Sequence, residues 1–181
     1  MIDLIIPTVS QGLLWALMAL GVYITFRVLD IADLSVEGTF PLGAAVASTA
    51  LTAGLGTVPA FLLAAVAGAL AGIVTALLTT KLKIPALLAG ILTMIGLYSV
   101  NLHVMGKANI SLLRVDTVFS LVRDWGVTDA VATFIVGLAA VLLVGVAIYW
   151  FFGTELGTAI RATGFNPQMA RAQGISTDTM V

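Results

Sequence analysis

Charge and cysteine are what this sequence lacks. Only 9% of its 181 residues are charged, and it contains no cysteine. A soluble domain carries about 25% charged residues, so this chain has too few to cover a water-facing surface. The absence of cysteine excludes disulfides, thiolate metal sites and a cysteine nucleophile. The net charge of −1 supplies no overall field that would attract nucleic acid or anionic substrates.

Apolar residues are abundant instead, at 60% of the chain, and they are grouped in long runs. Each run is close to the roughly 20 residues that a helix needs to cross a membrane. One run carries Pro41 and is short, so it is either a full span or a broken, partly re-entrant one. The sequence therefore predicts an all-α, polytopic membrane bundle over residues 1–152. The five expected spans are 5–29, 39–57, 59–80, 85–103 and 128–152.

The N-terminus and the loop charges predict an orientation. The stretch MIDLIIPTVS lacks a basic region and a small-residue cleavage site, so it is not expected to be a cleavable signal peptide. Lysine and arginine favour the cytoplasmic side, which places the N-terminus outside and residues 153–181 in the cytoplasm. In this orientation Lys107, Arg114 and Arg123 remain outside, and the positive-inside bias is modest. The expected cytoplasmic set is Arg27, Lys81, Lys83, Arg161 and Arg171.

Two segments have spacing that predicts packing. Small residues recur every four positions from Ala60 to Ala76, and such a ridge lets helices approach closely in lipid, although alanine and glycine are also simply common in spans. The expected packing residues are Ala64, Gly68 and Gly72. Residues 104–127 are expected to form an extracytoplasmic amphipathic segment, either interfacial or docking a partner. Its apolar residues are Val115, Val118, Phe119, Val122 and Trp125, and its polar residues are Asp116, Ser120, Arg123 and Asp124.

The sequence shows no enzymatic site. His103 is the single histidine and stands at the end of a span without a second metal-binding side chain near it in sequence. Gly106 and Lys107 are not preceded by the glycine that a phosphate-binding loop requires. We therefore expect no metal, no cofactor and no enzymatic activity in this chain. Any ATP-driven work would need a second subunit.

Acidic residues are concentrated in RVLDIADLSVEG. On one continuous helix, Arg27, Asp30, Asp33 and Glu37 would share roughly one face. Acids within a membrane commonly line a pathway, but the same residues also fit a solvated turn before Pro41. Small and polar residues of the fourth span either line a pathway or pack helices. The pathway candidates are Asp30, Asp33, Ser35, Glu37, Thr93, Ser99 and Asn101.

The stretch ELGTAIRATGFNPQMARAQGIS, residues 155–176, is called the elbow below. Glu155 suits a helix start, and Gly164 is expected to stop that helix. Asn166 and Pro167 then predict the cap and first turn of a second short helix, which continues to Gly174. Such a slim, kinked segment suits insertion into a groove of another protein, with a plain linker as the alternative.

The elbow resembles the cytoplasmic coupling loop of permeases of ATP-binding-cassette importers, in the branched-chain amino acid and ribose permease superfamily. The similarity extends to QGLLWALMALGVYITFRVLDIADLSVEGTFPLGA, where Asp33, Leu34, Ser35 and Val36 match a family segment and Glu37 departs from it. Together with the run LAGILTMIGLYSVNLHVMGKANI, this variant is most similar to the tryptophan or tyrosine importer subgroup. The matching elbow positions are Gly157, Ala159, Ile160, Arg161, Ala162, Gly164, Asn166, Pro167, Ala170, Gly174 and Ile175.

The resemblance implies a permease for amino acids or similar small solutes in the bacterial cytoplasmic membrane. Its partners would be a second permease copy, an extracytoplasmic substrate-binding protein and a separate ATPase. Family permeases continue for further spans, so this chain is expected to be C-terminally truncated relative to them. A rival hypothesis is an ion-coupled secondary transporter that uses the acids of residues 30–37; another is a scaffold subunit that transports nothing. The implied ATPase-coupling residues are Glu155, Gly157, Arg161, Gly164, Asn166, Pro167, Ala170, Arg171 and Gly174.

Overall fold

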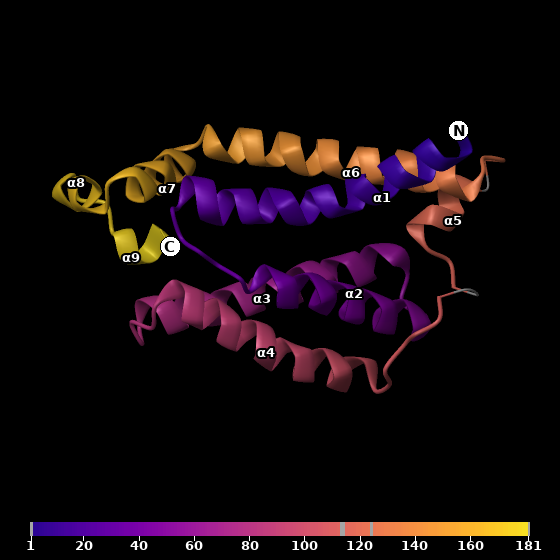
Figure 1. Ribbon diagram of the computed structural model, residues 1–181, viewed down its shortest axis with the longest axis horizontal. Helices are drawn as coiled ribbons and strands as arrows, with labels where there is room; N and C mark the ends of the chain where they lie inside the picture. Colours follow the sequence, from indigo (N-terminus) through magenta and orange to yellow (C-terminus); the bar gives the residue numbers. More distant parts are fainter. Residues whose placement is uncertain (1, 113–114, 124, 181) are drawn as a thin grey trace. The chain divides into compact units, whose positions relative to one another are not determined.

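The computed structural model describes residues 2–112, 115–123 and 125–180, and this part of the chain contains helices and no strand (Figure 1). The prediction of an all-α membrane bundle is confirmed. The chain divides into two compact units, one of residues 1–33 with 127–181 and the other of residues 34–126. The helices are α1 (Ile2–Tyr23), the π-helix η1 (Ile24–Val28), α2 (Val36–Thr52), α3 (Thr57–Thr80), α4 (Ala86–Met105), α5 (Val118–Arg123), α6 (Asp129–Phe152), α7 (Glu155–Phe165), α8 (Pro167–Ala172) and α9 (Thr177–Met180).

Four segments in the described part of the chain are long and apolar enough to cross a membrane: Ile5–Val28, Thr57–Thr80, Ala86–Met105 and Asp129–Phe152. They coincide with four of the five predicted spans. The remaining stretch forms α2, which has only 17 residues and contains Pro41. At 1.5 Å per residue α2 is about 25 Å long, somewhat shorter than a typical hydrocarbon core of about 30 Å.

In the first unit, α1 and α6 lie side by side and run in the same direction (Figure 1). Near their starts the Ser10 hydroxyl donates to the carbonyl oxygen of Ala130, at 3.2 Å. A Cβ added to Gly137 would lie 3.2 Å from the Cβ of Leu13, so a glycine there allows the two helices to approach closely. At the other end, Ile24 of η1 and Ile148 of α6 line one cavity.

In the second unit, α2, α3 and α4 pack against one another. A Cβ on Gly38 would lie 2.9 Å from the Cα of Met94, so α2 crosses α4 almost backbone to backbone. The Thr75 hydroxyl of α3 donates to that of Thr93 of α4, at 3.0 Å, and both side chains are buried. A polar bond of this kind between membrane helices contributes about 1 kcal/mol.

The buried side of α3 differs from the predicted ridge. Its buried residues are Ala60, Ala71 and Thr75, whereas Gly72 is exposed. A Cβ at Gly68 or Gly72 would meet nothing within 4 Å. A repeat of four residues advances about 40° more than one helical turn at each step, so a ridge that begins at Ala60 leaves the buried face. Packing through Gly68 and Gly72 therefore remains a prediction, and it would require a helix that does not belong to this unit.

The segment predicted to be amphipathic forms α5, a helix of six residues. Val115, Val118 and Val122 are partly buried, while Trp125 is 76% exposed. The predicted amphipathic helix therefore forms over only about one and a half turns of the segment. Arg114 and Asp124, named in the sequence analysis, lie outside the described residues.

Candidate functional site

The elbow begins at a well-defined helix start. Thr154 caps α7, its hydroxyl oxygen accepting from the backbone N–H of Gly157 at 3.3 Å. Glu155 occupies the first turn, where a carboxylate interacts favourably with the helix dipole. The sequence prediction that a helix starts at Glu155 is confirmed. The capping threonine was not singled out, although a threonine immediately before a helical run is a recognisable start signal.

The turn between α7 and α8 is built around Asn166. Its backbone N–H donates to the Ala162 carbonyl oxygen, at 3.0 Å, and so ends α7. Its side-chain oxygen accepts from the backbone N–H of Met169, also at 3.0 Å, and so caps α8. Pro167 takes the first position of α8, where a missing N–H costs nothing. One residue thus closes two helices, and the kink predicted from Asn-Pro is confirmed.

The second half of the elbow is closed at Gly174. This glycine has φ of +84°, and the N–H of Ile175 donates to the carbonyl oxygen of Ala170, at 3.0 Å. Ala170 itself is only 3% exposed. The guanidinium Nε of Arg171 donates to the hydroxyl of Thr177 at 2.6 Å, which ties α8 to α9. Ala170, Arg171 and Gly174 therefore hold the second short helix in place.

The prediction that Gly164 stops the first helix is wrong, because α7 continues to Phe165. Gly164 is needed for a different reason. A Cβ at this position would collide with the carbonyl oxygen of Val28 and lie 2.9 Å from the Cα of Leu29, at the end of η1. Gly157 stands two turns earlier on the same face of α7. A Cβ there would lie 2.5 Å from the Cα of Phe152.

These two glycines seat α7 directly on backbone. Gly157 rests on the end of α6 and Gly164 on the end of η1, so the one helix contacts the C-terminal ends of both parallel spans. The π-helical turn that precedes the second contact has an i to i+5 bond from Leu29 N–H to the Ile24 carbonyl oxygen, at 3.1 Å. Such turns occur frequently at functional sites.

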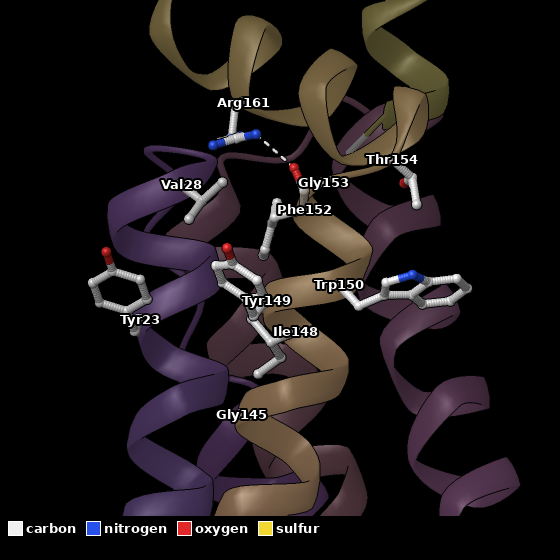
Figure 2. A pocket seen from close by; sticks show the side chains of 10 residues that line it. All are labelled: Tyr23, Val28, Gly145, Ile148, Tyr149, Trp150, Phe152, Gly153, Thr154 and Arg161. Atoms are coloured by element: carbon white, nitrogen blue, oxygen red, sulfur yellow. Dashed lines mark hydrogen bonds between the residues drawn. The ribbon is translucent and has the colours of Figure 1, made fainter.

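Arg161 fastens the same contact with its side chain. Its guanidinium donates to the Phe152 carbonyl oxygen at 2.5 Å and stands 5.9 Å from the centre of the Phe152 ring. Figure 2 shows this bond above a cavity at the junction of α1, η1, α6 and α7. The cavity has a volume of about 700 Å³, and Tyr23, Tyr149 and Trp150 on its wall are all more than half exposed.

The outer side of the elbow is apolar and uncovered within the first unit. Phe165 is 93% exposed and Met169 is 59% exposed. Asn166 and Pro167 lie between them in the sequence and are also exposed. The structure thus divides the predicted coupling residues. Gly157, Arg161 and Gly164 hold α7 against the spans, whereas Asn166 and Pro167 are exposed at the kink. Phe165 and Met169 are apolar residues of the kinked segment that the sequence predicts to enter a groove of another protein, and the structure exposes both of them.

The pathway candidates are divided between the two units. The continuous helix on which the charged residues of the acidic segment would share one face is not formed, because residues 29–35 are not helical and Asp30 has φ of +55°. Asp30 and Asp33 belong to the first unit, whereas Ser35 and Glu37 belong to the second. Ser35 is buried and Glu37 is exposed at the start of α2.

The three candidates on α4 have three different environments. Thr93 is occupied by its bond to Thr75, and Ser99 is exposed. Asn101 is 8% exposed and lines a cavity between α2 and α4 together with Glu37. No group of three or more histidine, aspartate or glutamate side chains in the described part of the chain has a geometry that could hold a metal ion.

Comparison with known proteins identifies the class to which this fold and elbow belong. Residues 4–181 match the family described as the permease component of branched-chain amino acid transport systems, and the chain belongs to that family. A tyrosine transport system permease protein of Clostridioides difficile is 38% identical over 172 residues, which cover 95% of this chain and 56% of that protein. No solved structure matches the chain.

Two further relatives are more distant. An uncharacterized protein of Rickettsia prowazekii is 35% identical over 92% of this chain and 57% of its own length. An autoinducer 2 import system permease protein of Yersinia pseudotuberculosis is 32% identical over 94% of this chain and 47% of its own length. The chain thus spans about half the length of these relatives. Family membership and the four apolar helices define a multi-pass membrane protein.

Proposed function

We propose that this chain is part of the permease subunit of an ATP-binding-cassette importer and that the elbow receives the motion of a separate ATPase. The observation that carries the proposal is the seating of α7 on the ends of both α6 and η1 through Gly157 and Gly164. A displacement of α7 therefore moves the backbone of two spans together. A coupling element needs this kind of rigid contact, since an effector shifts an equilibrium only through contacts that differ between its states.

The exposed apolar side of the elbow supports a partner in the cytoplasm. Phe165 and Met169 flank the kink and have no cover within their own unit. An aromatic side chain and an adaptable methionine are typical anchors at protein interfaces. We infer that these two side chains enter a groove on the ATPase. Arg161 holds α7 against the end of α6 through its hydrogen bond to the Phe152 carbonyl oxygen.

The parallel arrangement of α1 and α6 supports a topology in which α2 also crosses the membrane. If both helices are spans, the chain must return to the starting side between them, which takes an odd number of crossings. Helices α3 and α4 provide two, so α2 provides the third. We propose that the N-terminus lies outside and residues 153–180 lie in the cytoplasm, in agreement with the positive-inside bias.

The solute is proposed to be an amino acid or a similar small molecule, because the relative from C. difficile is named a tyrosine transport permease. A second permease copy and an extracytoplasmic binding protein complete the proposed assembly. The rival secondary transporter would use the three acids of residues 30–37 as proton or cation sites. Asp30 and Asp33 lie in a non-helical segment and Glu37 lies at the start of α2, and uptake driven by an ion gradient alone would favour this alternative.

The test uses the full-length permease in proteoliposomes with its ATPase and binding protein. Phe165→Ala is expected to leave membrane insertion unchanged and to lower solute-stimulated ATP turnover at least about tenfold, since hot-spot aromatics contribute about 2 kcal/mol or more. Phe61→Ala is the matched control, because Phe61 is also exposed but lies on α3. Equal stimulation in both variants would contradict the coupling role.

A further inference from the structure

A cavity of about 390 Å³ lies within the second unit, between the first turns of α2 and the middle of α4. This volume falls within the range of about 300–1,000 Å³ that small-molecule sites occupy. Gly38 lies at its edge, where the near contact with Met94 brings the two helix backbones together. The lining side chains are Glu37, Pro41, Met94, Ile95, Tyr98 and Asn101.

Asn101 carries an unused acceptor at this cavity. The residue is 8% exposed, and its amide nitrogen donates to the Gly38 carbonyl oxygen over a long distance of 3.5 Å. Its side-chain oxygen is buried and has no hydrogen-bond partner in the part of the chain that the structure describes. A buried acceptor without a donor is costly, and in native proteins such a group commonly has a functional explanation.

The cavity is lined by an acidic residue, which favours a positively charged hydrogen-bond donor as its ligand. Glu37 is exposed and contributes a carboxylate, and none of the described lining residues is basic. Tyr98 contributes a phenol and a ring face. A carboxylate, an amide oxygen and a phenol are three acceptors, and a protonated primary amine has three N–H donors. A cation is also attracted to the face of an aromatic ring.

We propose that this cavity is a subsite for the protonated amine of a small solute with an apolar body. Glu37 supplies the counter-charge, Asn101 accepts a hydrogen bond, and Met94 with Ile95 contacts the apolar part. The proposal rests on the assignment of the chain as a permease and adds the group that the permease recognises. An anionic solute without an amine is repelled by Glu37 and leaves the Asn101 oxygen unpaired.

The test measures occupancy directly, without ATP or transport. A cysteine replaces Ile95, which is 62% exposed on the cavity wall, in a full-length permease free of other cysteines and purified in detergent. The rate at which a maleimide modifies this cysteine is followed with two probes. Tyramine carries an amine and no carboxylate, whereas 3-(4-hydroxyphenyl)propionate carries the same ring with a carboxylate and no amine.

Tyramine is expected to slow modification at least fivefold at saturation, and the propionate is expected to have no effect. Glu37→Gln should raise the half-maximal tyramine concentration about tenfold or more, since it removes a charge-assisted hydrogen bond. Asp116→Asn, an exposed acid of the same unit away from the cavity, is the matched control and should change nothing. Asn101→Leu, which removes the unpaired acceptor, should weaken tyramine protection while the purified protein stays monodisperse.

Three outcomes would overturn the inference. They are equal protection by both probes, protection that persists in Glu37→Gln, and a cysteine that is shielded before any probe is added because another helix or a second copy covers the cavity. Failure of the permease assignment is distinguishable from failure of the subsite. If the assignment is wrong, the full-length assembly shows no ATP-coupled uptake, whereas tyramine still slows modification of the cysteine. Conversely, ATP-coupled uptake without amine protection would refute only the subsite.

Discussion

Gly164 of α7 packs directly on the carbonyl oxygen of Val28, at the end of the π-helical turn, with no room for a side chain between them. The contact joins the elbow to the first span, just as Gly157 joins it to α6. The first helix of the elbow, α7, therefore contacts the ends of two spans and not only the end of α6, which precedes it in the chain. This arrangement gives Gly164 a testable role.

Gly164→Ala should detach α7 from η1, because the added methyl group would occupy the position of the Val28 carbonyl. We expect it to lower the free energy of unfolding by about 1–3 kcal/mol, as overpacking does, and to abolish solute-stimulated ATP turnover. Gly164→Val should act in the same direction and more strongly. Thermal unfolding and ATPase assays on the full-length assembly measure both effects.

The control for this substitution is Gly21→Ala, since a Cβ on Gly21 of α1 would meet nothing within 4 Å. Both glycines are inside helices, so alanine should improve helix propensity equally at both. A Gly164→Ala protein as stable and as strongly stimulated as Gly21→Ala would show that the close contact does not exist in the assembly.

Arg161→Gln should loosen the same helix without crowding it. The variant loses the charged donor to the Phe152 carbonyl oxygen and the cation above the Phe152 ring. We expect hydrogen exchange of residues 155–165 to accelerate about tenfold, because a charge-assisted hydrogen bond contributes about 1.5 kcal/mol or more. Arg161→Lys, which keeps the charge, should show a smaller effect, and no change in exchange for either variant would refute the bracing role.

Asn166→Ala should unravel the start of α8. Its side-chain oxygen caps the N–H of Met169, and loss of such a cap costs about 1 kcal/mol. Faster exchange should appear in residues 168–172 and should be absent in Asn166→Asp, which keeps an oxygen at the capping position. If the alanine and aspartate variants exchange alike, the kink is maintained by Pro167 and the packing of Ala170 instead.

Cysteine labelling in whole cells tests whether α2 crosses the membrane. With the N-terminus outside and α2 crossing, a cysteine at Leu55 should react with an impermeant maleimide, and cysteines at Leu82 and Gln168 should react only after the cells are opened. Reaction at Gln168 in intact cells would place the elbow outside and remove the basis for coupling to an ATPase. Protection at Leu55 would mean that α2 returns to the side from which it entered.

The elbow shows which features are written in local sequence. Asn166 and Pro167 predicted the kink correctly because a cap and a first-turn proline act within three or four residues of backbone. The spans were equally predictable, since a long apolar run has few alternatives to a membrane helix. The start of α2 was less predictable. The spacing of charged residues in residues 27–37 is compatible with a continuous helix, but residues 29–35 are not helical.

Tertiary structure decided what no local pattern encodes, namely which neighbour each polar or small side chain meets. Thr93, Ser99 and Asn101 look alike in the sequence, but Thr93 is bonded to Thr75, Ser99 is exposed, and Asn101 is buried with an acceptor that has no partner among the described residues. Gly164 looked like a helix stop and is a contact point. The apolar character of a segment and its capping residues determine each helix separately. Close approach of backbones and pairing of buried polar groups depend instead on which faces of different helices pack together.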